Sequence, residues 1–382
     1  MLSDFKKNTL LNAKNLVGWK TKRKIVVFSV DDYGNVRLDS REARDRMEQQ
    51  GLKVLSPFKG FDLYDSLENR ADLEMLLEVL TSVKDHNGRH AVFTPFAVPC
   101  NINFEKIEED GFSQYHFEML PQTYSKLSSS QPDAYEGAWA LWKEGLDSGL
   151  LVPQFHGREH INLKLFNEKL EKGDRELITS LKNRSYARIS SNEYSMISPA
   201  TAFDFWDFSE TKVFHDIIGD GLNAFEQVFG YRAVHFNPPG GRQHPIIYES
   251  LKNNGIKYID TPLLKTEHQG RGKYRKVFNY TGKQTQFGQT FLVRNVVFEP
   301  THPRRNDWVP YAMKQIEAAF RWNRPAIISS HRVNFCGHID EDNRRKGLEA
   351  LQRLLKNITE RWPDVEFMAA NELGSLIDSK KK

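Results

Sequence analysis

Short apolar runs recur along the chain and alternate with segments of helical periodicity. The run at 25–30, Ile-Val-Val-Phe-Ser-Val, has five apolar residues in six positions, which is typical of a strand buried on both faces. Leucines at 73, 76, 77 and 80 share one face at helical spacing and predict a helix within residues 72–86. Seven runs are predicted to be strands, at residues 25–30, 91–96, 150–155, 233–236, 257–260, 326–330 and 365–370.

Most of these predicted strands are separated by predicted helices. Such alternation favours an α/β fold whose parallel sheet is closed, or nearly closed, into a barrel. We expect one barrel domain over residues 24–375, between an N-terminal arm at 1–23 and a polar tail at 376–382. Two insertions are expected: an irregular segment at about 97–135 that lies over one end of the domain, and a hairpin-like excursion at 264–300.

The composition argues against several functional classes. The 382 residues include 54 basic and 50 acidic side chains, and a net charge of +4 gives no reason to predict nucleic-acid binding. The two cysteines, Cys100 and Cys336, are far apart, which indicates neither a disulfide framework nor a thiolate zinc site. The chain starts without the apolar run of a signal peptide and contains no 18-residue apolar stretch. We therefore expect a cytoplasmic protein without a membrane span; nothing in the sequence indicates its oligomeric state.

Polar side chains gather where the predicted strands end. In a parallel barrel, the working face lies at the carboxyl ends of the strands, where the chain passes into loops. Scattered structural polar residues would not be expected to collect there so regularly. Five of the seven strands end in such a candidate, and these residues are Asp31 with Asp32, His156, Asn237, Asp260 and His331.

The adjacent carboxylates Asp31 and Asp32 follow the first strand directly. Two neighbouring carboxylates repel each other, and they leave water together only at a cost unless a cation or a proton compensates them. The pair therefore indicates a metal site, an acid/base site, or both. The alternative is that one of them caps the next helix, because Asp is a common N-cap residue.

Two histidines, His156 and His160, are four residues apart after the third strand. If a helix begins at His156, this spacing brings both imidazoles to one side. With one carboxylate they form a nitrogen and oxygen donor set that suits zinc or another divalent transition metal. The alternative is a pair of surface histidines on a helix. A zinc-protease motif is excluded, because its glutamate directly follows the first histidine, whereas Glu159 directly precedes the second.

Four short motifs occur in an order that resembles the polysaccharide deacetylases, carbohydrate esterase family four. They are Val-Asp-Asp-Tyr-Gly at 30–34, His-Gly-Arg-Glu-His at 156–160, Asn-Pro-Pro-Gly-Gly at 237–241 and Ser-Ser-His at 329–331. The resemblance covers most of residues 24–375. It implies a distorted (β/α) barrel, often with seven strands, that acts on acetylated saccharides.

The resemblance also implies a role for each motif residue. Asp32, His156 and His160 would hold a divalent metal, with Zn²⁺ as the first choice, and Asp31 would be the general base. His331 would be the general acid that protonates the leaving amine. Acetyl groups would be removed from N-acetylated (or O-acetylated) sugars or saccharide precursors by attack of metal-bound water. The chemistry is sound in itself, because a metal lowers the pKa of its water and polarises the acetyl carbonyl.

The third motif departs from the family pattern. An arginine usually precedes the Pro-x-Gly and orients the base, but this chain has Asn237 at that position. Because asparagine supplies no charge, we expect Arg242 or Arg158 to hold Asp31 instead. Asn237 and Gly240 are expected to support the substrate side of the site.

Asp260 is a candidate for the carboxylate that tunes His331. Its alternative is a turn residue before Thr261-Pro262. Two alternative functions also stay open. One is a glycoside hydrolase or another C–N hydrolase on the same barrel. The other is a non-catalytic carbohydrate-binding barrel, suggested by the missing arginine at position 237.

Overall fold

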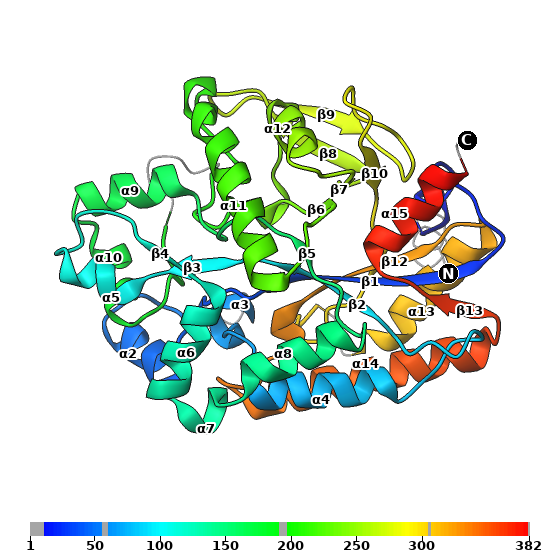
Figure 1. Ribbon diagram of the computed structural model, residues 1–382, viewed down its shortest axis with the longest axis horizontal. Coiled ribbons are helices and arrows are strands. Elements are labelled where there is room, and N and C mark those ends of the chain that lie inside the picture. The colour runs from blue at the N-terminus through cyan, green and yellow to red at the C-terminus, as the bar shows by residue number, and fades with distance from the viewer. Residues whose placement is uncertain (1–10, 56–59, 191–196, 305–306, 381–382) are drawn as a thin grey trace.

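The computed structural model describes residues 11–55, 60–190, 197–304 and 307–380. Within them, nine parallel strands form one curled sheet in the order β10-β7-β6-β5-β2-β1-β12-β11, and β13 pairs with the start of β1 (Figure 1). The α/β fold with a distorted (β/α) barrel is therefore confirmed. The strands are β1 (Lys24–Tyr33), β2 (Phe93–Ala97), β5 (Gln154–Phe155), β6 (His235–Phe236), β7 (Tyr258–Asp260), β10 (Thr290–Leu292), β11 (Val296–Val297), β12 (Ala326–His331) and β13 (Val365–Phe367).

All seven predicted strands are present, but β10 and β11 join them in the same sheet. Both come from the segment at 264–300 that was expected to be a hairpin excursion. Only its first part, β8 (Leu264–His268) and β9 (Tyr274–Phe278), is an antiparallel hairpin. The expectation was wrong for the rest because β10 and β11 have only three and two residues, and so short a run does not show whether it pairs locally or with a distant strand.

Helices cover the outside of the sheet and the loops. They are α2 (Arg41–Gln49), α3 (Gly60–Tyr64), α4 (Arg70–Thr81), α5 (Phe104–Glu109), α6 (Leu120–Ser130), α7 (Pro132–Tyr135), α8 (Ala138–Asp147), α9 (Leu163–Glu171), α10 (Arg175–Lys182), α11 (Phe214–Phe229), α12 (Tyr248–Asn253), α13 (Val309–Arg321), α14 (Glu341–Arg361) and α15 (Ala370–Ser379). In Figure 1, α4, α8 and α14 lie together along one side of the barrel. Most of the buried residues of these helices are apolar and belong to the core. No helix of the described residues is long and apolar enough to cross a membrane.

The segment at 97–135 is more regular than expected. It contains an antiparallel pair, β3 (Cys100–Ile102) and β4 (Phe117–Met119), together with α5, α6 and α7. At the other end of the chain, α15 continues to Ser379 and buries Ile377, so the polar tail is shorter than expected. The described part of the N-terminal arm is held by Arg324, which donates to the carbonyls of Asn15 at 2.9 Å and Leu16 at 2.8 Å.

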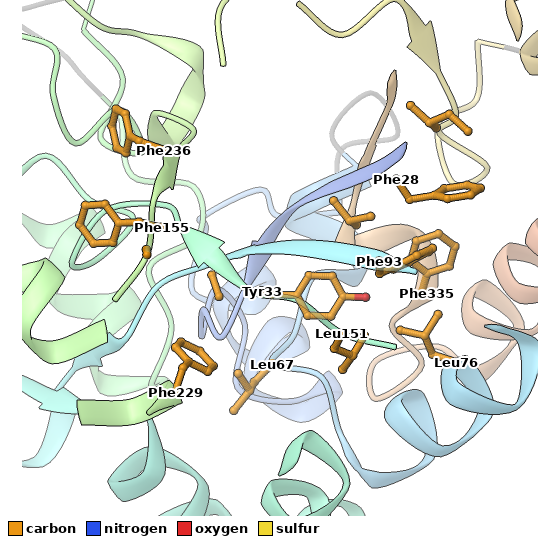
Figure 2. Close-up of a cluster of buried hydrophobic side chains, with 14 of the residues drawn as sticks. Phe28, Tyr33, Leu67, Leu76, Phe93, Leu151, Phe155, Phe229, Phe236 and Phe335 are labelled. Atoms are coloured by element: carbon orange, nitrogen blue, oxygen red, sulfur yellow. The ribbon is translucent and has the colours of Figure 1, made fainter. Parts of the chain in front are cut away.

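Strand β1 lies at the centre of the core, with nine of its ten residues buried. Phe28 stacks on Phe93 of β2 with ring centroids 5.3 Å apart, and Phe93 in turn meets Phe335 (Figure 2). On its other edge, β1 pairs with β12 in an unbroken register from Val26 opposite Ala326 to Asp31 opposite His331. This register brings the ends of the two strands, and the polar side chains they carry, to the same place.

Candidate metal centre and active site

The end of β1 turns sharply and separates its two carboxylates. Asp32 has a φ of +73°, a left-handed conformation that is uncommon for residues other than glycine and that persists only where surrounding structure enforces it. Gly34 follows with a φ of +75°, and a Cβ there would lie 2.7 Å from the carbonyl oxygen of Val98. The turn therefore needs glycine at position 34.

Asp32 faces the two histidines of the loop after β5. Its Oδ1 lies 2.9 Å from His160 Nε2 and 3.3 Å from His156 Nε2, and all three side chains are buried. This group could hold a metal ion, since one ligand atom from each residue lies within 4.8 Å of the others. Burial contradicts the alternative of two surface histidines. The expected helix is absent too, because residues 156–160 form a bend around Gly157, whose φ is +97°.

The donor atoms fit a divalent transition metal. His156 Nδ1 lies 2.8 Å from the carbonyl oxygen of Asn237, an arrangement that places the proton on Nδ1 and leaves the Nε2 lone pair toward Asp32. His160 Nδ1 is buried and has no hydrogen-bond partner among the described residues. One carboxylate oxygen and two imidazole nitrogens are ligands typical of zinc and its neighbours, with positions left open.

Electrostatics keep Asp32 in the form that binds cations. Burial alone would raise the pKa of this carboxyl group, but His160, His156 and His331 together hold it well below its usual range. The carboxylate is therefore ionised at neutral pH, held so by histidine side chains.

Asp31 has different partners. Arg294 binds both of its oxygens, Nη1 to Oδ2 and Nη2 to Oδ1 at 2.7 Å each, and Asn237 Nδ2 donates to Oδ1 at 2.9 Å. Asp31 and Asp260 raise the pKa of Arg294 although burial opposes its charge. The bidentate geometry fixes the carboxylate plane.

Arg294 therefore replaces the residues that the sequence suggested for holding Asp31. Arg158 instead binds Glu159, with Nε 2.7 Å from Oε2, and Arg242 lies over the ring of Tyr274. The sequence did contain a signal for Arg294, because it follows the β-rich run that becomes β10. That run was assigned to the excursion and not to the barrel, so its polar end was not considered.

Asp260 does not contact His331, which corrects a second expectation. Its Oδ2 accepts from Arg294 Nε at 2.7 Å, and its Oδ1 lies 2.8 Å from His235 Nε2. Glu299 takes the expected place, with Oε1 2.7 Å from His331 Nδ1. Glu299 follows β11, a strand of two residues that was not predicted, so the sequence did not connect Glu299 with His331.

His331 is held as a cation by its surroundings. Burial would lower its pKa, but Glu299, Asp32 and Asp31 together raise the pKa of His331 to about 10. Its Nε2 lies 3.8 Å from Asp31 Oδ2, across the β1–β12 pair. A carboxylate and an imidazolium thus face the same space next to Asp32.

This space is a cavity of about 430 Å³. Most of the predicted site residues line it, namely Asp31, Asp32, His156, His160, Asn237, Gly240 and His331. A smaller cavity of about 200 Å³ shares Asn237 with it and reaches Asp260 and Arg294. Two of the predicted site residues, Arg158 and Arg242, are not among the described residues that line either cavity.

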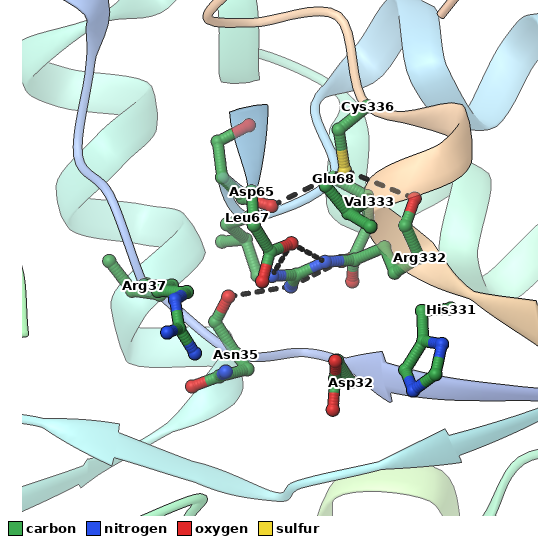
Figure 3. A network of polar contacts seen from close by, with 12 residues as sticks. Asp32, Asn35, Arg37, Asp65, Leu67, Glu68, His331, Arg332, Val333 and Cys336 are labelled. Atoms are coloured by element: carbon green, nitrogen blue, oxygen red, sulfur yellow. Dashed lines mark hydrogen bonds and ion pairs between the residues drawn. The ribbon is translucent and has the colours of Figure 1, made fainter. Parts of the chain in front are cut away.

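A buried ionic network stands behind the site (Figure 3). Arg332, the residue after His331, is 1% exposed and binds Asp65 Oδ1 at 2.8 Å and Glu68 Oε2 at 3.1 Å. It also donates to the carbonyl of Asn35, while Glu68 accepts from the N–H of Gly34 at 3.1 Å. The network therefore ties the end of β12 to the turn that carries Asp32.

Comparisons with known proteins give distant similarities in structure. No family model and no curated protein matches the sequence. Among solved structures, PuuE allantoinase is 12% identical, with 94% of this chain and 91% of that chain covered and a TM-score of 0.45. A probable polysaccharide deacetylase from Pseudomonas aeruginosa PAO1 is 11% identical, with 93% and 91% covered and a TM-score of 0.45.

A third solved structure is much larger than this protein. The 4-α-glucanotransferase from Thermococcus litoralis is 12% identical, with 92% of this chain covered and a TM-score of 0.44. This chain spans only 40% of the glucanotransferase. Similarities this distant do not place the chain in a family.

Proposed function

We propose that the protein is a metal-dependent hydrolase that removes acetyl groups from N-acetylated (or O-acetylated) sugars or saccharide precursors. One observation carries the proposal. A carboxylate, Asp31, and an imidazolium, His331, lie 3.8 Å apart in the lining of one cavity, beside the buried group of Asp32, His156 and His160. A general base, a general acid and a metal site are the three parts that hydrolysis of an amide or ester needs.

The buried group would hold the metal, for which Zn²⁺ is our choice. Asp32 Oδ1 and the Nε2 atoms of His156 and His160 are the ligand atoms that face one another. When bound, the ion would polarise the acyl carbonyl and lower the pKa of water.

Asp31 would take the proton from the attacking water. Arg294 and Asn237 orient the carboxylate, so that Oδ2 faces the cavity close to His331 Nε2. Orientation of this kind lowers the entropic part of the barrier, because the base is already in place. Arg294 supplies from position 294 the charge that is missing at position 237, which favours the catalytic proposal over the non-catalytic alternative.

His331 would give its proton to the leaving amine nitrogen. Its raised pKa keeps the imidazolium protonated at neutral pH, and Glu299 holds Nδ1 so that Nε2 points toward Asp31. A cation bound at Asp32 would lower that pKa toward the range in which an imidazolium donates readily.

Metal analysis combined with an acetate-release screen tests the proposal. Purified protein should contain about one divalent ion per chain and release acetate from at least one N-acetylated sugar. His156→Ala should lose both properties, whereas the exposed Lys346→Gln on α14 serves as the matched control. The proposal fails if His156→Ala leaves the metal content unchanged, or if the product is a new reducing end and not acetate, which would indicate a glycoside hydrolase.

A further inference from the structure

A second cavity adjoins the catalytic one. It has a volume of about 590 Å³, and Arg37 and Ala200 line both cavities. Arg37 lies at the junction, 5.7 Å from the ring of Phe61, a residue of the catalytic cavity, and 5.7 Å from the ring of Tyr186 in the second cavity. Both volumes are in the range of ligand pockets, so the two together offer room for a substrate longer than the group that reacts.

The second cavity is attached rigidly to the catalytic turn. Tyr186 is buried in its wall, and its hydroxyl accepts from Asn35 Nδ2 at 2.6 Å. Asn35 follows Asp31 and Asp32 on the same turn, and its carbonyl is bound by Arg332. A ligand that occupied both cavities would therefore meet groups at a fixed separation, which is how a remote part of a substrate positions the reacting part.

The lining of the second cavity has more basic than acidic side chains. Its two carboxylates are satisfied: Asp62 Oδ1 is bound by Arg37 Nη2 at 2.7 Å, and Glu176 Oε2 accepts from Ser190 N at 3.0 Å and Oγ at 2.6 Å. Arg188 is not neutralised in this way, because its only hydrogen bond within the described residues runs from Nε to the carbonyl of Leu52 at 3.4 Å.

Lys53 adds a second cation to this lining, since it is exposed and has no carboxylate partner among the described residues. Arg37 and Asp62 compensate each other, so the two cations Lys53 and Arg188 stand against one further carboxylate, Glu176, and the lining carries an excess of one positive charge. A guanidinium whose Nη atoms are unpaired suits carboxylates and phosphates.

We infer that the substrate is an acetylated saccharide that carries a second, anionic group, a carboxylate or a phosphate, which binds beside Arg188 and Lys53 while the acetyl group occupies the catalytic cavity. This inference rests on the proposed function and adds the substrate class to it. The anionic group would be recognised electrostatically, at a distance from the reacting atoms. The protein should therefore prefer anionic acetylated sugars to neutral ones.

The test compares three probes on the zinc-loaded full-length protein. They are N-acetylglucosamine, its 6-phosphate, and an N-acetylated amino-sugar uronic acid. The ratio of kcat/KM for an anionic probe to kcat/KM for the neutral sugar should exceed about tenfold and should fall with added salt, since exposed charges are screened. Arg188→Gln and Lys53→Gln should each lower that ratio about threefold, a change typical of one exposed charge, whereas Lys346→Gln should leave it unchanged. The probe with the larger ratio identifies phosphate or carboxylate as the preferred anion.

Calorimetric binding of the same probes separates the two proposals. If no probe loses acetate but the anionic probes still bind more tightly than the neutral sugar, and Arg188→Gln reduces this difference, the anion site stands and the deacetylase function fails. If acetate is released and the ratio is the same in wild type and both cavity variants, the anion site is overturned and the deacetylase function stands.

Discussion

Asp31 and Asp32 are neighbours in sequence but belong to two different electrostatic regions. Asp31 lies in a region of permanent charge, where the guanidinium of Arg294 binds both of its oxygens. Asp32 lies among histidines, and within the described part of the chain its ion-pair partners are the imidazoles of His156 and His160. A carboxylate paired with arginine is already compensated and has no need of a metal, whereas one that faces imidazoles needs a cation or protons on the rings to compensate it. The difference supports the proposed roles of Asp31 as the base and Asp32 as the metal ligand.

The largest expected effect separates the two carboxylates directly. Asp31→Asn should keep the metal content and lower kcat about 10²–10⁴-fold, the contribution typical of a general base. Asp32→Ala should lose the metal together with the activity. Metal analysis and acetate release on both variants measure this difference. Loss of the metal from Asp31→Asn would contradict separate roles for the two carboxylates.

The second expected effect is a loss of stability when the permanent charge of Arg294 is removed. Arg294→Met would leave Asp31 and Asp260 buried without their common cation, and breaking a buried pair in this way costs about 3–5 kcal/mol. Urea unfolding should show this loss, while the exposed Arg321→Met on α13 should change stability by much less. An unfolding free energy of Arg294→Met equal to that of wild type would mean that the guanidinium does not compensate the two carboxylates.

The smallest expected effect is a pH dependence of the free energy of unfolding that comes from His331. His331 has a folded-state pKa of about 10 against an ordinary value of 6.5, so the native state binds the proton more tightly than the unfolded chain. The stability that this provides is complete below about pH 6.5 and is lost as the pH rises toward 10. Glu299→Gln removes the main charge that raises the pKa and should flatten this loss.

The measurement for that variant is the free energy of unfolding of chelator-treated protein at pH 6 and at pH 9.5. Wild type should lose more stability between the two values than Glu299→Gln, and the exposed Glu360→Gln should behave as wild type. Equal pH dependence in Glu299→Gln and wild type would show that Glu299 does not set the protonation of His331.

The sequence predicted the barrel and the polar ends of its longer strands for a physical reason. The buried runs before Asp31 and His331 are long enough to show their period, and they pair side by side, so the candidates at their ends do meet. Arg294 and Glu299 were missed because they follow strands of three and two residues, too short to be assigned to the barrel. The same rule that found Asp31, a polar residue just after a buried strand, applies to both of them once β10 and β11 are known.

The histidine pair shows a different limit of prediction from sequence, which concerns the backbone conformation. The spacing of His156 and His160 predicted convergence by way of a helix, yet a bend at Gly157 brings the rings together. Spacing four residues apart is compatible with both geometries, so the pattern indicated the ligands without indicating the backbone that presents them.

The register between β1 and β12 has a consequence for where this chain can change its length. Side chains alternate across a strand, so a slip of one residue would turn Asp31 away from His331 and expose the wrong face of the strand to the cavity. An insertion or deletion within either strand would therefore separate Asp31 from His331 even if the barrel still closed. By contrast, the segments after β2 and β7 carry an additional antiparallel pair each, and both lie outside this ladder. Changes of length in the loops of those two antiparallel pairs would therefore leave the β1–β12 register intact.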